Sequence, residues 1–402
     1  MNKKIIFGAI GILIAIVVAL SWPPSTVESV IYAKFENVNE SVSENISTID
    51  VYFDASTSMK AYLVSDDGRF CGKISNLYRC ADSINMYFLK TGNIIEPFKD
   101  RIANISNYIN KFDGGDTQFD LLIPYLCQKS KSGKVCAFVT DGILYFNKNT
   151  YKGLDEFENT LAKAIGKEGN DKAFAIYNYS ANFMGNNIGK RICYFDMNDK
   201  PTLLEEKNRP YYIIFIGMPN DIRKIKTLEG ELLNPEKALY FGVHDFNNHT
   251  KGKQFKPDTS PVLVNPNSPL TLSTTLPQCM SFLYDNYKSY FSVNNIKVYL
   301  TPIGGAEKKL SENEYTINVT KGTAVNLDII LAANPGRGQG QVKVVVENTI
   351  PYEWKDLSIE NDSSIELHKD RTFGLENLIN GIKLAADGSN TSLVNIYFDY
   401  RF

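Results

Sequence analysis

Residues 49–58 read IDVYFDASTS, and the prediction of the fold starts from them. Its first half is mostly apolar and β-prone, which predicts a strand that ends at Asp54. Ser56 and Ser58 follow the aspartate at alternate positions, so a carboxylate and two hydroxyls are expected above the end of one strand. Oxygen donors of this kind are the ligands that hard divalent cations prefer.

Two later stretches have the same character. Residues 114–117, GGDT, precede apolar residues at 119, 122, 123 and 126, and this spacing predicts a helix that begins just after Thr117. Pro124 lies early in that helix, where a proline costs less than in the middle. Residues 135–140 are almost continuously apolar, as in a strand buried on both faces, and Asp141 follows them.

Strand and helix patterns alternate from residue 49 to about residue 230. Apolar spacing predicts helices at 102–112, 154–165 and 221–228, and a further helix within 74–88. Strands are expected at 94–98, 173–179 and 210–217. This alternation predicts an α/β fold with an open, doubly wound, mostly parallel sheet and helices on both of its faces. Ligands bind to such sheets outside the carboxyl ends of the strands.

The three motifs, in this order and at these strand ends, resemble the von Willebrand factor A domain, a Rossmann-like fold with a metal-ion-dependent adhesion site. The resemblance covers about residues 49–230, and a loop that carries Cys71 is an insertion relative to the family pattern. It implies a metal site made by Asp54, Ser56, Ser58, Thr117 and Asp141. The expected ion is Mg²⁺, or alternatively Mn²⁺ or Ca²⁺.

The resemblance also implies a function in binding. In that family an acidic side chain of a protein partner commonly completes the metal's coordination, so a protein partner that contributes a carboxylate is expected here. Two carboxylates and three neutral hydroxyls leave a divalent ion able to accept one more acid. The expected class is therefore a binding, adhesion or assembly protein and not an enzyme.

Three alternatives remain open from sequence. The hydroxyls and carboxylates could cap helices without any metal. The protein could be a metal-dependent phosphohydrolase with Asp54 as nucleophile, although Ser56 stands where such a mechanism requires a second acid. It could also be a structural envelope component with a degenerate metal site. With three histidines, none near a nucleophile motif, no Ser/His/Asp or Cys/His set is evident.

The pattern changes beyond residue 245. Apolar residues recur at period two in 296–300, 325–331 and 394–400, and residues 342–347 are also β-prone, which predicts a smaller all-β, sandwich-like module. One helix is expected at 277–291. The predicted organisation is a membrane anchor at 1–22, a linker at 23–47, the α/β domain at 48–245 and the β-rich domain at 246–402.

The N-terminus carries a compartment signal. Lys3 and Lys4 precede residues 5–22, an uncharged run about long enough to cross a bilayer as a helix. The lysines should remain cytoplasmic, which places the rest of the chain outside the cytoplasm, either in the periplasm or at the cell surface. Ala19-Leu20-Ser21 resembles a cleavage site, so a removed signal peptide is the alternative.

Charge and cysteine content agree with this placement. The formal net charge of −2 gives no electrostatic reason to expect nucleic acid as a partner. The cysteine count is six, which permits disulfides in an oxidising compartment. The pairs favoured by sequence are Cys71–Cys80, Cys127–Cys136 and Cys193–Cys279, and separate buried thiols are the alternative.

Overall fold

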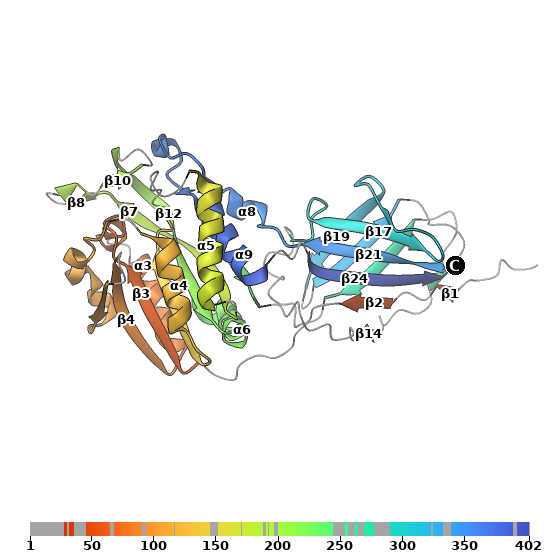
Figure 1. Ribbon diagram of the computed structural model, residues 1–402, viewed down its shortest axis with the longest axis horizontal. Coiled ribbons are helices and arrows are strands. Elements are labelled where there is room, and N and C mark those ends of the chain that lie inside the picture. The colour runs from red at the N-terminus through yellow and green to blue at the C-terminus, as the bar shows by residue number, and fades with distance from the viewer. Residues whose placement is uncertain are drawn as a thin grey trace, which may run out of the picture.

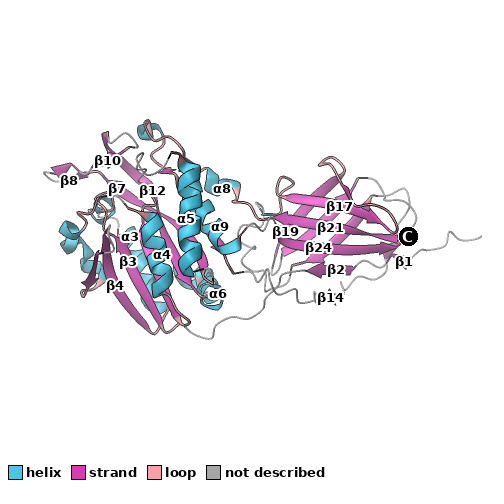
Figure 2. Ribbon diagram, viewed as in Figure 1, coloured by secondary structure: helices cyan, strands magenta, loops and turns pink. Residues whose placement is uncertain are grey.

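The structure is a computed structural model. It describes residues 28–29, 32–35, 46–64, 68–90, 94–115, 117–144, 152–169, 171–187, 190–191, 193–196, 200–243, 254–255, 262–263, 269–276, 290–322, 325–332, 339–388 and 392–401. Two units lie side by side, one with helices around a large sheet and one built mainly of strands (Figure 1; Figure 2). The fold is therefore mixed α/β with additional antiparallel sheets, as expected from sequence.

The large sheet has seven strands in the order β13-β7-β12-β6-β3-β4-β5. Their bounds are Thr48–Asp54 for β3, Ser83–Lys90 for β4, Ile94–Phe98 for β5, Lys134–Thr140 for β6, Ala173–Met184 for β7, Glu205–Gly217 for β12 and Lys237–Phe241 for β13. β3 pairs in parallel with both β4 and β6. The carboxyl ends of β3 and β6 therefore lie at one edge of the sheet, where the predicted site residues follow them.

The other pairings of this sheet are antiparallel, which differs from the mostly parallel, doubly wound sheet predicted from sequence. β12 runs antiparallel to both β6 and β7, β13 to β7, and β5 to β4. The described residues between β7 and β12 form the short strands β8 (Asn186–Asn187), β9 (Lys190–Arg191), β10 (Cys193–Phe195) and β11 (Pro201–Leu203). β7 and β12 pair as a long hairpin, and the described residues between them form no crossover helix, so β12 is reversed.

Helices cover both faces of the sheet. α4 (Phe119–Lys129), α5 (Leu154–Gly169) and α9 (Leu375–Asp387) lie side by side on one face (Figure 1). α2 (Lys60–Leu63), α3 (Arg69–Ser75) and η2 (Ile102–Lys111) lie on the other, and α6 (Pro219–Thr227) follows β12. Side chains alternate along β12: Tyr211 packs on Phe70 of α3, whereas Tyr212 packs on Trp354 on the opposite face.

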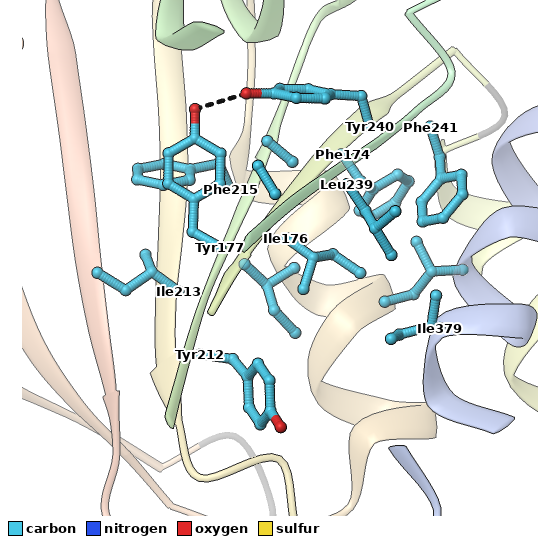
Figure 3. Close-up of a cluster of buried hydrophobic side chains, with 14 of the residues drawn as sticks. Phe174, Ile176, Tyr177, Tyr212, Ile213, Phe215, Leu239, Tyr240, Phe241 and Ile379 are labelled. Carbon is cyan, nitrogen blue, oxygen red and sulfur yellow. Dashed lines mark hydrogen bonds between the residues drawn. The ribbon is translucent and has the colours of Figure 1, made fainter. Parts of the chain in front are cut away.

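The core between the sheet and these helices is aromatic and aliphatic. Figure 3 shows Ile379 of α9 beside Leu239 and Phe241 of β13, on the face that α9 covers. On the other face the hydroxyls of Tyr177 and Tyr240 are 2.9 Å apart and share a hydrogen bond. The sheet is therefore buried on both sides, as the continuous apolar runs in the sequence indicate.

The helix expected within residues 74–88 is wrong over most of its length. α3 ends at Ser75, the short helix η1 (Asn76–Arg79) follows, and β4 begins at Ser83. A spacing of four residues, such as Ile84 to Phe88, places side chains on one face of a helix and equally on one face of a strand. The strands expected at 94–98, 135–140, 173–179 and 210–217 and the helices expected at 119–126, 154–165 and 221–228 are confirmed in type.

The described residues of the second unit form two extended antiparallel sheets and a short antiparallel pair of β1 (Glu28–Ser29) with β15 (Val262–Leu263), in agreement with the period-two pattern. The larger has the order β14-β2-β24-β21-β17-β18 and the smaller the order β16-β20-β19. Their bounds are Tyr32–Phe35 for β2, Gln254–Phe255 for β14, Leu270–Thr275 for β16, Ile296–Pro302 for β17, Lys308–Lys309 for β18, Tyr315–Lys321 for β19, Val325–Leu331 for β20, Gln339–Glu347 for β21 and Ser392–Arg401 for β24. The two sheets touch, because the Tyr315 hydroxyl donates to the Ile296 carbonyl at 2.9 Å.

The two units do not follow the predicted boundary at 245/246. Part of the expected β-rich domain lies on the large sheet instead: α8 (Tyr352–Lys355), β22 (Ser358–Ile359), η5 (Ile365–Leu367), β23 (Thr372–Phe373) and α9. The apolar stripe of α9 packs against α5, which explains its place (Figure 1). Conversely β2, in the predicted linker, pairs with β24 of the second unit.

Other predictions fall partly or wholly outside the described residues. No helix of the described part is long and apolar enough to cross a membrane, and the predicted anchor at 1–22 lies outside that part. Most of the helix expected at 277–291 and Cys279 also lie outside it. The predicted disulfides Cys71–Cys80 and Cys127–Cys136 are not formed in the structure.

The local geometry accounts for the unpaired state of Cys80. Its thiol donates to the Asn76 carbonyl one turn earlier, at 3.4 Å, and therefore points back along its own chain. Burial raises the pKa of this thiol to about 11, which keeps it protonated and poorly reactive.

Candidate metal centre

Asp54 is the centre of the site. It is the last residue of β3, and its side chain is only 2% exposed. The Thr117 hydroxyl lies 3.0 and 2.9 Å from its two carboxylate oxygens, and the Thr140 hydroxyl donates to Oδ2 at 2.7 Å. The backbone N–H of Ser56 donates to Oδ1 at 3.0 Å. Groups from three separate stretches of chain therefore converge on one carboxylate.

The loop before α4 is fixed to the loop after β3 by backbone pairing. The N–H of Gly114 donates to the Ala55 carbonyl at 2.9 Å, and the N–H of Thr57 donates to the Gly114 carbonyl at 3.2 Å. A Cβ at Gly114 would lie 2.8 Å from the Ala55 carbonyl oxygen, so only glycine fits this approach. The pairing brings Thr117, three residues later, to Asp54.

Ser56 and Ser58 present their hydroxyls together. The two Oγ atoms are 3.2 Å apart, in the turn that leads from β3 into α2. Ser56 is buried and Ser58 is half-buried. Alternate positions in this extended turn thus point to the same side, as the sequence pattern suggested.

Asp141 contributes the second carboxylate. It follows β6 directly and is 2% exposed. Oδ1 accepts a hydrogen bond from the N–H of Ile143 at 3.2 Å, whereas Oδ2 has no hydrogen-bond partner among the described residues. A buried anionic oxygen without a partner is costly, so this atom calls for a cation or another donor.

The electrostatics of the two carboxylates are coupled. Burial raises the pKa of Asp141 to about 6; the negative charge of Asp54 adds to this rise, and the nearby Ser58 hydroxyl opposes it. Burial also raises the pKa of Asp54, against the hydrogen bonds from Thr140, the Ser56 N–H and Thr117. A bound cation would relieve both the desolvation and the mutual repulsion of this pair.

The residues present fit a hard divalent cation. Two carboxylates and three hydroxyls at one strand edge supply the oxygen ligands that Mg²⁺ takes, with water for the remaining positions. In the described part of the chain no cluster of three or more His, Cys, Asp or Glu side chains could hold a metal ion. Any metal at this site would therefore depend on the hydroxyl groups as well as on Asp54 and Asp141.

The helix-capping alternative finds no support at these residues. The residue that precedes α2 is Met59, and the residue that precedes α4 is Gln118. Neither makes a side-chain cap hydrogen bond, and the Thr117 hydroxyl is turned to Asp54 instead of to the helix. All five predicted site residues thus lie at the same edge of the sheet, and Thr117 is bonded directly to Asp54.

Sequence reasoning missed two residues here. Thr140, the last residue of β6, holds Asp54 and also accepts a hydrogen bond from the N–H of Gly142 at 3.1 Å. Its signal was its place beside Asp141 at a strand end. The other is Arg209, a fully buried cation on β12 that no motif marks.

Comparisons with known proteins add no relatives. The chain matches no protein-family model, and a search of curated proteins finds no match either. The resemblance to the von Willebrand factor A domain therefore remains a prediction from the sequence motifs.

Proposed function

We propose that this protein is a binding protein of the von Willebrand factor A type, in which Asp54, Ser56, Ser58, Thr117 and Asp141 hold Mg²⁺ or a similar divalent ion. The ion in turn binds a carboxylate of a protein partner. Its role is adhesion or assembly, and not catalysis.

The donor set supports a metal that remains open to one more ligand. Asp54 and Asp141 balance the charge of a divalent ion, while the three hydroxyls add ligands without adding charge. An ion held in this way keeps positions for water, which an acidic side chain can replace. The proposed partner group is therefore Asp or Glu, as the resemblance implies.

One observation carries the proposal. Among the described residues Asp141 Oδ2 is buried without a hydrogen-bond partner, and it lies beside a second buried carboxylate, Asp54, which accepts hydrogen bonds from three donors. Such an arrangement is unfavourable for the empty site and favourable for a cation-loaded one. The phosphohydrolase alternative has less support, because both oxygens of Asp54 accept hydrogen bonds and Ser56 offers no second acid.

The direct test is calorimetric titration of the full-length protein with Mg²⁺ and with Mn²⁺. Asp54→Asn should abolish binding, because the amide cannot neutralise the ion. Asp50→Asn is the matched control, because Asp50 lies on the same strand and is also buried. Its carboxylate forms an ion pair with Lys134, with an N···O distance of 2.6 Å, and takes no part in the site. It should bind the ion as the wild type does.

The outcomes separate the candidate functions. Binding that is lost in Asp54→Asn and kept in Asp50→Asn supports the metal adapter, that is, a metal ion at the proposed site that joins the protein to a partner carboxylate. Equal binding in both variants would place the metal elsewhere in the chain. No binding in the wild type would refute the adapter and favour a structural component with a degenerate site.

The proposal includes a location. Residues 5–22 would anchor the chain in a membrane as a single N-terminal helix, and both units would lie outside the cytoplasm, in the periplasm or at the cell surface. Protease digestion of intact and of permeabilised cells tests this. We expect the protease to digest both units in cells whose cytoplasmic membrane is intact. Protection of the two units from the protease in such cells would contradict a location outside the cytoplasm.

A further inference from the structure

Arg209 is buried beside the metal centre with part of its hydrogen-bonding capacity unused. The side chain is 0% exposed. Its Nη1 donates to the Lys369 carbonyl at 2.6 Å, but Nε and Nη2 have no hydrogen-bond partner among the described residues. The guanidinium lies over the rings of Phe183 and Tyr194, 5.1 and 5.3 Å from their centroids. Arginine stays protonated even when buried, so this is a desolvated positive charge.

The strand register places Arg209 at the metal-binding edge of the sheet. β12 runs antiparallel to β6, and Tyr212 pairs with Thr140. Residues of β12 that precede Tyr212 therefore lie alongside the chain that follows Thr140, which is where Asp141 stands. The next residue after Arg209, Pro210, accepts a hydrogen bond at 2.6 Å from Tyr62, one helical turn after Ser58.

Charge effects on nearby groups agree with this placement. Burial raises the pKa values of Tyr62, Tyr194 and Tyr212, and in each case the charge of Arg209 lowers the pKa while that of Asp141 raises it. Arg209 also lowers the pKa of Asp141, against the larger effects of burial and Asp54. The two charges therefore act on the same small volume.

A buried positive charge at this place is unusual for a cation site, because it repels the ion that the site binds. Asp54 and Asp141 together balance a divalent ion, and Arg209 then adds one positive charge. The buried carboxylate of Asp362 also lies near Arg209: it accepts a hydrogen bond from the Tyr194 hydroxyl at 2.5 Å, and its negative charge partly offsets that of Arg209. The low polarity of the interior strengthens electrostatic interactions, so the charge of Arg209 acts on the metal ion and on any ligand that binds to the ion.

We propose that Arg209 is a specificity-determining residue which weakens metal binding and strengthens the binding of an anion to the metal-loaded site. The inference rests on the proposed function and adds to it. It explains why the site should prefer a partner carboxylate over water: the positive charge of Arg209 raises the electrostatic potential at the ion, and this favours an anionic ligand over a neutral one. Arg209 itself stays buried and acts through its charge, without touching the partner.

The proposal predicts opposite changes for the two ligands. In Arg209→Met, which keeps the length of the side chain but not the charge, Mn²⁺ should bind about tenfold more tightly. Acetate, the simplest carboxylate, should bind the Mn²⁺-loaded protein several-fold more weakly. The effect on the metal should be the larger, since the ion carries two charges and acetate one.

The experiment combines two titrations of the full-length protein at fixed ionic strength. Mn²⁺ affinity is measured by calorimetry, and acetate affinity by the loss of water-proton relaxation enhancement as acetate displaces water from bound Mn²⁺. Arg209→Lys retains the charge and should resemble the wild type. Arg69→Met removes an exposed arginine that bonds the same strands through Asn182 and Asn208, and it controls for net charge.

Each outcome is decisive. Tighter Mn²⁺ with weaker acetate in Arg209→Met alone supports the proposal. Unchanged affinities in a folded Arg209→Met would overturn it while the metal adapter stands. No Mn²⁺ binding by the wild type would overturn both.

A second measurement covers the case in which variants of Arg209 do not fold. In the wild type, the ¹⁵Nε resonance of the buried arginine should shift when acetate is added with Mg²⁺ present and stay fixed when Mg²⁺ is absent. A resonance that ignores acetate in the Mg²⁺-loaded protein would refute the proposal.

Discussion

Asp387 joins the two units, and its replacement by asparagine should stabilise the protein at neutral pH. The carboxylate ends α9, with Oδ1 accepting from the N–H of Gly242 at 2.6 Å and Oδ2 from the side chain of Asn348 at 3.0 Å. Gly242 follows β13 of the large sheet and Asn348 follows β21 of the second unit. Burial raises the pKa of Asp387 to about 6, although both hydrogen bonds and the charge of Lys383 oppose the rise.

The magnitude follows from this shift. The ordinary pKa is 3.8, so the ionised form is disfavoured in the folded protein by about two pH units, or about 3 kcal/mol. The pKa of Asp387 is higher in the folded than in the unfolded protein. The contribution of this group to the free energy of unfolding is therefore fully present below pH 3.8 and is lost as the pH rises to about 6. Above that value the loss stays constant. Asn at this position has no charge to desolvate, and its Oδ1 can still accept the hydrogen bond from the N–H of Gly242.

The assay is urea unfolding of Asp387→Asn and wild type between pH 4 and pH 8, followed by the fluorescence of Trp354 in α8. The variant should gain up to about 3 kcal/mol relative to the wild type as the pH rises from 4 to 7. Asp171→Asn is the control, since Asp171 is exposed and pairs with Lys172 at the surface. A stability difference that does not change with pH would refute the reasoning.

Three further predictions concern the site and the core. Gly114→Ala should lower the free energy of unfolding by about 1–3 kcal/mol and weaken Mn²⁺ binding, because the added Cβ collides with the Ala55 carbonyl. Gly115→Ala is the control: its Cβ has no neighbour within 4 Å, so thermal unfolding should be unchanged. Thr117→Val should keep the fold but lower Mg²⁺ affinity at least tenfold in calorimetry, and unchanged affinity would remove Thr117 from the site. Ile379→Ala should cost about 2–5 kcal/mol in urea unfolding, and a smaller loss would contradict its place in the core.

The site was predictable because its signals are local. Asp54, Ser56 and Ser58 lie within five residues of one another, and each of the other two predicted donors stands next to a helix start or a strand end. Strand ends that carry oxygen donors gather at one edge once the strands are parallel, as β3 and β6 are. Arg209 gave no such signal, since it belongs to no motif and reaches the site through the register of β12.

The fold was less predictable where it depends on the direction of a strand or on contacts between residues far apart in the sequence. A continuously apolar strand has the same composition in either direction, so β12 could not be recognised as antiparallel. The apolar stripe of α9 shows that one face is buried but not which unit buries it. Period two and period four coincide at Ile84 and Phe88, so the local pattern did not separate strand from helix in β4.

The path of the chain between the two units has a consequence for biosynthesis. The chain passes from β2 in the second unit to β3 in the large sheet and returns to the second unit after β13. It comes back to the large sheet for α8 to α9 and then enters the second unit again as β24. During synthesis from the N-terminus, the apolar face of α5 is complete more than 200 residues before α9 emerges to cover it. A fragment that stops at residue 245 would leave this face open. The nascent chain therefore carries an uncovered face of the large sheet until α9 has been made, and a ribosome-bound chain would gain protease resistance in one late step.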